Sequence, residues 1–251
     1  MDAEKYLNRI RFKGFPKTDL DTLKKLHLHH MLYVPFENLD IHLGRKIILE
    51  PEALYNKIVL NNRGGFCYEM NGLFYEIITF LGFKAKRVSA RVFNDNGVPG
   101  REFDHMAIIV DIGGGKWLAD VGFGDSYLEP LKLVPDLEQT QYGKSYKIVK
   151  VDEEIFKTVF SEDGKEYKDM YLFSLTPREL AEYNEMCVYQ QESPDSHFIK
   201  NTVCTLARTG GRITLSGLKL IETKDGVKTE TVLKNTNEYN IKLKELFGII
   251  I

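Results

Sequence analysis

The spacing of apolar residues changes from a helical to an alternating period at about residue 84, and this change constrains the fold more than any other feature. Before it, apolar residues recur at the spacing of one helix face, at Met70, Leu73, Phe74, Ile77, Ile78 and Leu81. After it, Val88, Ala90 and Val92 alternate with polar residues, as in a strand with one buried face. We therefore expect an α+β protein in which a helical part precedes a β part.

Proline, glycine and capping residues divide the helical part into four helices. The first lies near the start, and the second begins at a cap formed by Thr18 and ends before Pro35. The third begins at Pro51, and the fourth begins with Cys67 and ends near Gly82. The segment that follows Pro35 must be extended or turning.

The β part is typical of an antiparallel sheet that can close into a barrel. Its clearest signal is a hairpin that turns at Gly113-Gly114. After this part, a capping box from Thr176 to Glu179 predicts a helix that begins at residue 177. Alternating segments follow at 202–208, 212–222 and 227–233, and Asn235 caps a terminal helix. The predicted units are a helical domain carrying the cysteine, a β-barrel and an α/β lid, at residues 1–83, 84–175 and 176–251.

The charge, apolar content, cysteines and histidines of the chain argue against several classes of function. The chain has 251 residues and a formal net charge of −2, so it lacks the basic surface of a nucleic-acid-binding protein. No stretch approaches the roughly 18 apolar residues of a membrane span, and we expect no membrane contact. Its three cysteines form neither a CxxC pair nor an even disulfide framework, which predicts a reducing cytoplasm. The histidines between residues 27 and 30 lack the i, i+4 pairing of a helical metal site, so we expect no metal.

Cys67 is the candidate nucleophile. Gly64 and Gly65 precede it, and we expect them to let the backbone turn sharply into the helix. In the first turn of a helix, unpaired N–H groups and the positive end of the dipole favour an anion, which predicts a thiol that ionises readily. The alternative is a small apolar cysteine that only fills space in a core.

A nucleophilic cysteine needs a base, and the base needs an acceptor that orients it. If the hairpin turns on Gly113-Gly114, then His105 and Asp120 are diagonal neighbours on one face of the sheet. A three-residue loop would reverse this parity unless a bulge restored it. Asp120 is flanked by apolar residues and is costly to bury alone, so an imidazolium is a suitable partner. Each could be an ordinary surface residue of a strand, but with the cysteine they favour a Cys-His-Asp site.

Three segments resemble the signature segments of the arylamine N-acetyltransferase family. They are Arg63-Gly64-Gly65-Phe66-Cys67-Tyr68-Glu69-Met70-Asn71, Val34-Pro35-Phe36-Glu37-Asn38-Leu39 and Asp120-Val121-Gly122-Phe123-Gly124. The first ten residues and the stretch from Cys204 to Gly217 are similar to that family as well, so the resemblance spans nearly the whole chain. Tyr68 departs from it, because bacterial members usually have Phe there. The resemblance implies the three units above, with a Cys-His-Asp arrangement like that of cysteine proteases.

The resemblance also implies roles for individual residues. The nucleophile, its base and the orienting acid are Cys67, His105 and Asp120. The oxyanion and donor loop consists of Tyr68, Gly122, Phe123 and Gly124. The aromatic residues of the acceptor pocket are Phe36 and Phe123. A buried structural charge cluster consists of Arg9, Glu37 and Arg63.

The activity that the resemblance implies is acetyl transfer from acetyl-coenzyme A to aromatic amines, hydrazines or N-hydroxyarylamines, as in xenobiotic metabolism. The acetyl group would pass through a thioester on Cys67 with ping-pong kinetics. The expected partners are the small acceptor and coenzyme A, and the expected protein is a monomer or a weak homo-oligomer. Three alternatives stay open: a transglutaminase-like hydrolase that uses the same residues, a non-catalytic binding protein, and an amide synthase that closes a polyketide.

Overall fold

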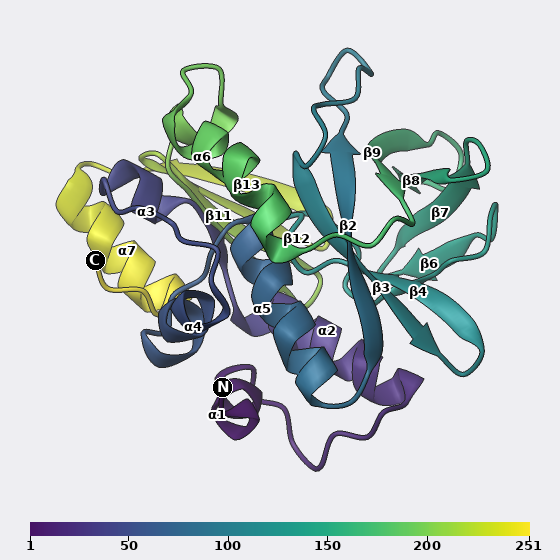
Figure 1. Ribbon diagram of the computed structural model, residues 1–251. Helices are drawn as coiled ribbons and strands as arrows, with labels where there is room; N and C mark the ends of the chain where they lie inside the picture. The colour runs from purple at the N-terminus through teal and green to yellow at the C-terminus, as the bar shows by residue number, and fades with distance from the viewer.

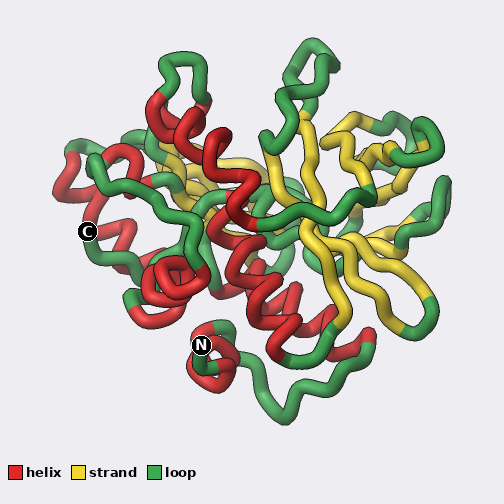
Figure 2. The backbone as a smooth tube through the Cα atoms, in the orientation of Figure 1, coloured by secondary structure: helices red, strands yellow, loops and turns green.

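Two antiparallel sheets and seven α-helices make up the computed structural model, which describes residues 1–251. Helix α5 (Cys67–Phe80) runs through the middle of the molecule. The strands of the larger sheet lie on one side of α5, and the helices α3 (Leu39–His42), α4 (Pro51–Tyr55) and α7 (Thr236–Phe247) lie on the other (Figure 1). Figure 2 shows the same division into a mainly helical half and a mainly β half.

The remaining N-terminal helices are α1 (Ala3–Arg9) and α2 (Leu20–Tyr33), and a π-helical turn at Asn56–Leu60 extends α4. The N-cap of α2 differs from the prediction, because Asp19 rather than Thr18 precedes the first helical residue. The Asp19 carboxylate accepts a hydrogen bond from the backbone N–H of Thr22 at 2.8 Å. The Thr18 hydroxyl instead donates to the carbonyl of Leu81, next to the end of α5, at 3.3 Å.

The larger sheet has eight strands in the order β5-β4-β3-β2-β9-β8-β7-β6. In chain order they are β2 (Lys84–Val92), β3 (His105–Ile112), β4 (Gly115–Ala119), β5 (Leu131–Lys132), β6 (Gln139–Gln141), β7 (Lys144–Lys150), β8 (Ile155–Ser161) and β9 (Lys168–Ser174). The hairpin between β3 and β4 pairs Ile112 with Gly115, so the predicted two-residue turn is confirmed. The short strands β5 and β6 carry no alternating pattern and escaped prediction.

The two edge strands of the larger sheet, β5 and β6, are joined by glutamine side chains. The Gln139 amide accepts a hydrogen bond from the N–H of Lys132 at 2.7 Å and donates one to its carbonyl at 3.0 Å. Gln141 makes the same two contacts with the backbone of Glu129, both at 2.9 Å. A primary amide offers the same donor and acceptor as a peptide group, so these side chains nearly close the sheet into a barrel.

The smaller sheet has five strands in the order β1-β10-β11-β12-β13. They are β1 (Phe36–Glu37), β10 (Val203–Arg208), β11 (Gly211–Ser216), β12 (Lys219–Lys224) and β13 (Val227–Val232). The segment after Pro35 is therefore extended, as predicted, but it pairs with the far end of the chain: Phe36 lies opposite Thr205 and Glu37 opposite Cys204. The single strand predicted over 212–222 is wrong, because Gly217 adopts a φ of 53° and the chain reverses between β11 and β12.

The helix predicted to begin at residue 177 begins later. The backbone N–H of Arg178 donates to the carbonyl of Arg87 on β2 at 2.9 Å, which holds this segment extended against the barrel. A 3-10 turn, Leu180–Tyr183, follows and leads into α6 (Asn184–Glu192), and a second short 3-10 turn spans His197–Ile199. The capping box is formed by Glu179 with Glu182.

Three groups of buried apolar side chains form the core. The largest packs α5 against its neighbouring helices and one face of β3, and includes Leu180, Tyr183 and Cys187 from beyond residue 176. The second lies inside the barrel. The third lies between the smaller sheet and α7, and includes Leu39. Side chains from the last third of the chain thus complete the core around α5. None of the helices is long and apolar enough to cross a membrane.

Candidate active site

Cys67 is the first residue of α5, and its side chain is only 4% exposed. Neither glycine before it has a positive φ, so the predicted sharp turn is not what requires them. A Cβ atom at Gly64 would lie 1.8 Å from the carbonyl oxygen of Pro35, and one at Gly65 would lie 2.6 Å from Cβ of Glu69. The two glycines therefore let the strand segment after Pro35 pass directly against the start of α5.

His105 and Asp120 are in contact, as the hairpin register predicted. His105 opens β3 and Asp120 directly follows β4, and Nε2 of His105 lies 2.8 Å from Oδ2 of Asp120. Both side chains are buried, His105 at 2% exposure and Asp120 at 0%. The remaining ring nitrogen of the imidazole, Nδ1, is not used by this pair and is available to exchange a proton with another group.

The second carboxylate oxygen of Asp120 is held by two uncharged donors. Nδ2 of Asn71 donates to Oδ1 at 2.8 Å, and the backbone N–H of Gly122 donates to the same atom at 2.9 Å. Burial alone would raise the pKa of Asp120, but the charge of His105 and these hydrogen bonds bring that pKa below its ordinary value. The acid is therefore ionised at neutral pH and fixed in direction.

Asn71 is a site residue that the sequence reasoning missed. It lies one turn after Cys67 on α5, donates to Asp120 and to the carbonyl of Met106 at 2.7 Å, and accepts from the N–H of Val121 at 2.9 Å. Its side chain is fully buried. The available signal was a lone polar residue at i+4 from the cysteine, beside the apolar stripe of that helix.

Gly122 lies against Cys67. A Cβ atom at Gly122 would meet the backbone of Cys67, 2.8 Å from its carbonyl oxygen and 2.9 Å from its Cα. The backbone N–H of Gly122, which the resemblance places in the oxyanion and donor loop, donates to Asp120 at 2.9 Å in this structure. Gly122 instead brings the end of β4 into contact with the start of α5.

The environment of the thiol differs from the sequence prediction. Burial raises the pKa of Cys67 well above its ordinary value, and the negative charges of Asp104 and Asp120 add to this rise. The backbone N–H of Tyr68 has the opposite effect on the pKa of Cys67. The prediction that the helix N-terminus makes this thiol more acidic is therefore wrong, because desolvation outweighs it.

The Tyr68 side chain is bound to the backbone of the segment before β3. Its hydroxyl donates to the carbonyls of Phe103 and Asp104 at 2.8 and 3.1 Å, and its ring packs edge-on against Phe66. The Tyr68 hydroxyl therefore uses its proton in a bond to the main chain. The backbone N–H of Tyr68 remains the part of this residue that can act at the sulfur.

The two predicted pocket aromatics both lie next to Gly124, Phe123 as its neighbour in the chain and Phe36 through space. The Phe123 ring packs edge-on against His105 with ring centroids 5.4 Å apart. Gly124 has a φ of 87°, and a Cβ there would lie 3.9 Å from the ring of Phe36. The Phe36 ring also contacts Phe198 at 6.2 Å between centroids, and both predicted pocket residues are half-buried. One aromatic ring thus lies beside the imidazole and the other beside Gly124.

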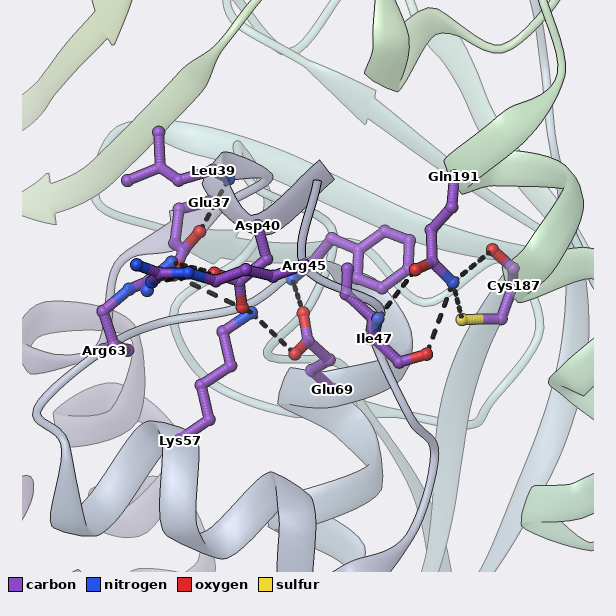
Figure 3. A network of polar contacts seen from close by, with 11 residues as sticks. Glu37, Leu39, Asp40, Arg45, Ile47, Lys57, Arg63, Glu69, Cys187 and Gln191 are labelled. Carbon is purple, nitrogen blue, oxygen red and sulfur yellow. Dashed lines mark hydrogen bonds and ion pairs between the residues drawn. The ribbon is translucent and has the colours of Figure 1, made fainter. Parts of the chain in front are cut away.

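A cluster of ion pairs lies at the start of α5 and includes Glu69 from the first turn of that helix (Figure 3). Glu37 binds Nε and Nη2 of Arg63 at 2.9 and 2.8 Å, and Asp40 binds Nη2 of Arg63 at 3.0 Å. Lys57 lies 2.7 Å from Glu69 and 2.8 Å from Asp40. We refer to Glu37, Asp40, Lys57, Arg63 and Glu69 as the ion cluster.

Glu69 connects the ion cluster to the catalytic helix. Its Oε2 accepts a hydrogen bond from the backbone N–H of Phe66, which caps α5, while its Oε1 binds Lys57. Burial raises the pKa of Glu69 to about 7, the attraction of Lys57 opposes this rise, and the negative charge of Glu37 adds to it. Burial outweighs the attraction of the single lysine.

Arg9 does not belong to the ion cluster, contrary to the prediction. Its guanidinium donates to the backbone carbonyls of Ile58, Tyr33 and Arg63, and to no carboxylate. Burial lowers the pKa of Arg9 to about 10. Arg9 therefore ties α1 to the backbone on either side of the cluster, while Lys57 supplies the second cation that the prediction had assigned to Arg9.

No group of three or more His, Cys, Asp and Glu side chains is arranged to hold a metal ion. The three histidines of α2 each contact a protein group through Nδ1. The partners of His27, His29 and His30 are the carbonyl of Leu128, the carbonyl of Ile10 and the hydroxyl of Tyr6, at 2.8, 3.0 and 2.8 Å.

Known proteins of one family match this chain along nearly its whole length. The family model described as N-acetyltransferase matches residues 19–251. The chain is 34% identical to the chicken arylamine N-acetyltransferase of the pineal gland, isozyme NAT-10, over 99% of this chain and 94% of that protein. It is 33% identical to the arylamine N-acetyltransferase of Escherichia coli K12, over 97% of this chain and 87% of the relative.

Solved structures show the same fold. The arylamine N-acetyltransferase of Salmonella typhimurium superimposes with a TM-score of 0.91 at 26% identity, covering 98% of this chain and 90% of that one. That of Mycobacterium marinum in complex with CoA superimposes with a TM-score of 0.89 at 29% identity, covering 99% and 93%. On its sequence and its structure alike, this chain belongs to the arylamine N-acetyltransferase family.

Proposed function

We propose that this protein moves an acetyl group from acetyl-coenzyme A to aromatic amines, hydrazines or N-hydroxyarylamines through a thioester on Cys67. The observation that carries the proposal is the buried contact between His105 and Asp120, joined through Gly122 to the backbone of Cys67. Family membership supplies the substrate class. The catalytic residues are Cys67 as nucleophile, His105 as base and Asp120 as the group that orients the base.

In the first half-reaction Cys67 attacks the carbonyl carbon of the acetyl thioester. Its proton passes to Nδ1 of His105, because Nε2 is bound to Asp120. The tetrahedral intermediate then breaks its bond to the sulfur of coenzyme A, which leaves with the proton returned by the imidazole. Asp120 accepts the other ring proton and stabilises the imidazolium while it exists.

The second half-reaction repeats these steps with the amine as attacking group. Its nitrogen forms a bond to the acetyl carbon, His105 accepts the amine proton, and the Cys67 thiol is released with that proton. The charge that develops on the carbonyl oxygen needs hydrogen-bond donors. We assign them to the backbone N–H of Tyr68 together with those of Phe123 and Gly124, because that of Gly122 is already bound to Asp120.

The aromatic rings next to Gly124 fit an aromatic acceptor. Phe123 packs against the imidazole and Phe36 lies beside Gly124, so a flat amine placed between them would have its nitrogen close to the base. We therefore assign Phe36 and Phe123 to the acceptor pocket.

Intact-mass spectrometry tests the proposal. Acetyl-coenzyme A alone should leave one acetyl group on Cys67, and an arylamine added afterwards should remove it and appear as the acetylated amine. The Cys67→Ala variant is the control and should acquire no acetyl group. An adduct on Cys187 or Cys204, or no adduct, would refute the assignment. Loss of the acetyl group to water as fast as to the amine would favour the hydrolase alternative.

A further inference from the structure

His27 connects α2 to the catalytic acid. It is fully buried and lies one turn before His30. Its Nε2 lies 3.1 Å from the backbone nitrogen of Asp120, and its Nδ1 lies 2.8 Å from the carbonyl oxygen of Leu128. The imidazole therefore contacts both ends of the segment 120–128, which includes Gly122, the glycine that lies against Cys67.

Only one proton arrangement satisfies both contacts of His27. The Leu128 carbonyl can only accept, so Nδ1 must carry a hydrogen, and the Asp120 N–H can only donate, so Nε2 must present its lone pair. A second proton on the ring would set two N–H groups against each other. His27 must therefore be neutral and in the Nδ1–H tautomer.

The surroundings of the ring favour this neutral form. Burial lowers the pKa of His27 to about 4, although the carbonyl of Leu128 and the negative charges of Asp120 and Glu129 act in the opposite direction. His30 is the other titratable group that faces it on α2. Stacking on Tyr127, with ring centroids 5.9 Å apart and planes at 17°, and an edge contact with Phe74 fix the ring plane.

The backbone of Asp120 needs this acceptor. The last backbone pair of the β3–β4 ladder is Ile108 with Ala119, so the next N–H along the chain, that of Asp120, lies beyond the sheet. This N–H is buried, and a buried amide without an acceptor is costly. His27 supplies the acceptor, while Asn71 and His105 bind the carboxylate. Main chain and side chain of the acid are thus held by different elements.

We propose that His27 is a positioning residue of the active site, which sets the place of Asp120 and of the Gly122–Gly124 segment by accepting a hydrogen bond from the Asp120 backbone. The proposal rests on the function proposed above, in which Asp120 orients His105. It assigns to α2 a part in the reaction that does not involve contact with either substrate.

Two substitutions of His27 each keep one of its contacts, with Asp120 or with Leu128, and remove the other. In His27→Gln the side-chain oxygen can reach the position of Nε2 and keep the bond to Asp120, while the bond to Leu128 is lost. In His27→Asn the shorter amide can reach only the position of Nδ1 and keep the bond to Leu128. The single-turnover rate of Cys67 acetylation should fall on the order of 100-fold in the Asn variant but only about fivefold in the Gln variant. The KM for acetyl-coenzyme A should not change in either.

His30→Asn is the matched control. His30 is equally buried on the same helix, and its Nδ1 contacts Tyr6 rather than the catalytic segment. This variant should lower the melting temperature as much as His27→Asn does and leave the acetylation rate nearly unchanged. If the two Asn variants slow acetylation equally, or if His27→Gln is as slow as His27→Asn, His27 has no positioning role.

A measurement on the unaltered protein does not depend on whether a variant folds. Long-range nitrogen-proton NMR spectra of the histidine rings should show His27 as the neutral Nδ1–H tautomer at pH 6 and above. A ring that titrates like a free histidine, or the opposite tautomer, would overturn the inference. Failure of the proposed function would appear differently, as an Asp120→Asn variant that acetylates Cys67 at the wild-type rate.

Discussion

Two buried acids lie close to the first turn of α5, and the protein stabilises them in different ways. Asp120 is surrounded by donors of fixed direction, namely Asn71, His105 and the N–H of Gly122, and its pKa is lowered. Glu69 belongs to the ion cluster, and its pKa is raised to about 7. Both are almost fully buried, at 0% and 2% exposure, so the depth of burial does not explain the difference.

The two pKa values differ because the two acids have different numbers of opposite charges and of directed hydrogen-bond donors around them. The ion cluster holds three carboxylates, those of Glu37, Asp40 and Glu69, but two cations, those of Lys57 and Arg63, and the exposed Arg45 reaches only Asp40, at 3.8 Å. One acid is therefore undercompensated, and desolvation favours its neutral form. Asp120 instead has three donors at 2.8 or 2.9 Å for its two oxygens. The comparison teaches that directed hydrogen bonds serve the chemistry, whereas the ion cluster holds segments together.

The largest effect should come from making the same isosteric change in both regions. Asp120→Asn should slow acetylation of Cys67 by about 1,000- to 10,000-fold, because an amide can hold His105 in the wrong tautomer and cannot stabilise the imidazolium. Glu69→Gln should cost far less activity. Stopped-flow measurement of coenzyme A release would check both. Comparable losses in the two variants would show that the regions do not differ as described.

Breaking the ion cluster should mainly affect stability. Glu37 is fully buried and binds Arg63 through one oxygen and the backbone N–H of Leu39 through the other. Glu37→Gln removes the charge that compensates the arginine and should lower the free energy of unfolding by about 3 kcal/mol. The control is Asp111→Asn, which removes a half-exposed pair with Lys116 and should cost less than about 0.5 kcal/mol. Urea unfolding would measure both, and equal changes would contradict the prediction.

The dependence of the thiol on its base gives a third test. Burial raises the pKa of Cys67, so an ionised sulfur requires His105 as proton acceptor. In His105→Gln the rate of iodoacetamide labelling of Cys67 should fall at least about tenfold at pH 7, because the group that accepts the thiol proton is gone. Peptide mass analysis gives the labelling of each cysteine. An unchanged pH profile would show that His105 does not control the thiol.

The last test concerns the pH dependence of stability, where the change per pH unit is small. The folded-state pKa of Glu69, about 7, lies above its ordinary value of 4.5, so the native protein binds more protons than the unfolded chain between these values. The contribution of Glu69 to stability is therefore complete below about pH 4.5 and is lost as the pH rises to 7. In Glu69→Gln this loss should vanish, changing the slope of the unfolding free energy by up to about 1.4 kcal/mol per pH unit. Parallel pH curves for the two proteins would contradict it.

Local patterns predicted the parts of the site that lie within one element or one hairpin. The apolar spacing after Cys67 predicted α5, and the two-residue turn set the parity that brings His105 to Asp120. The division into units at residues 84 and 176 is untested and stays a prediction, which limited proteolysis would check.

The features that escaped prediction depend on contacts between distant segments. Strand β1 pairs with β10, so that Glu37 lies opposite Cys204, which is far along the chain. No local pattern encodes this pairing. Lys57 and Asp40 became part of the ion cluster because α4 and α3 pack beside α5. The helix expected at residue 177 begins later because the N–H of Arg178 is bound by a carbonyl of β2. In each case tertiary contacts decided between locally acceptable alternatives.

At two places in this protein, glutamine side chains bond to a backbone in the way that a neighbouring strand would. We call each such place a seam. Besides the pair that joins β5 to β6, Gln191 of α6 accepts from the N–H of Ile47 at 2.7 Å and donates to its carbonyl at 3.4 Å (Figure 3). A side chain with peptide-like groups can close a seam without aligning two strands in register. Insertions and deletions in the flanking loops then leave the closure intact. Replacing such an amide by a carboxylate would remove the donor and set a negative charge against a carbonyl, so a glutamate at these positions would open the seam.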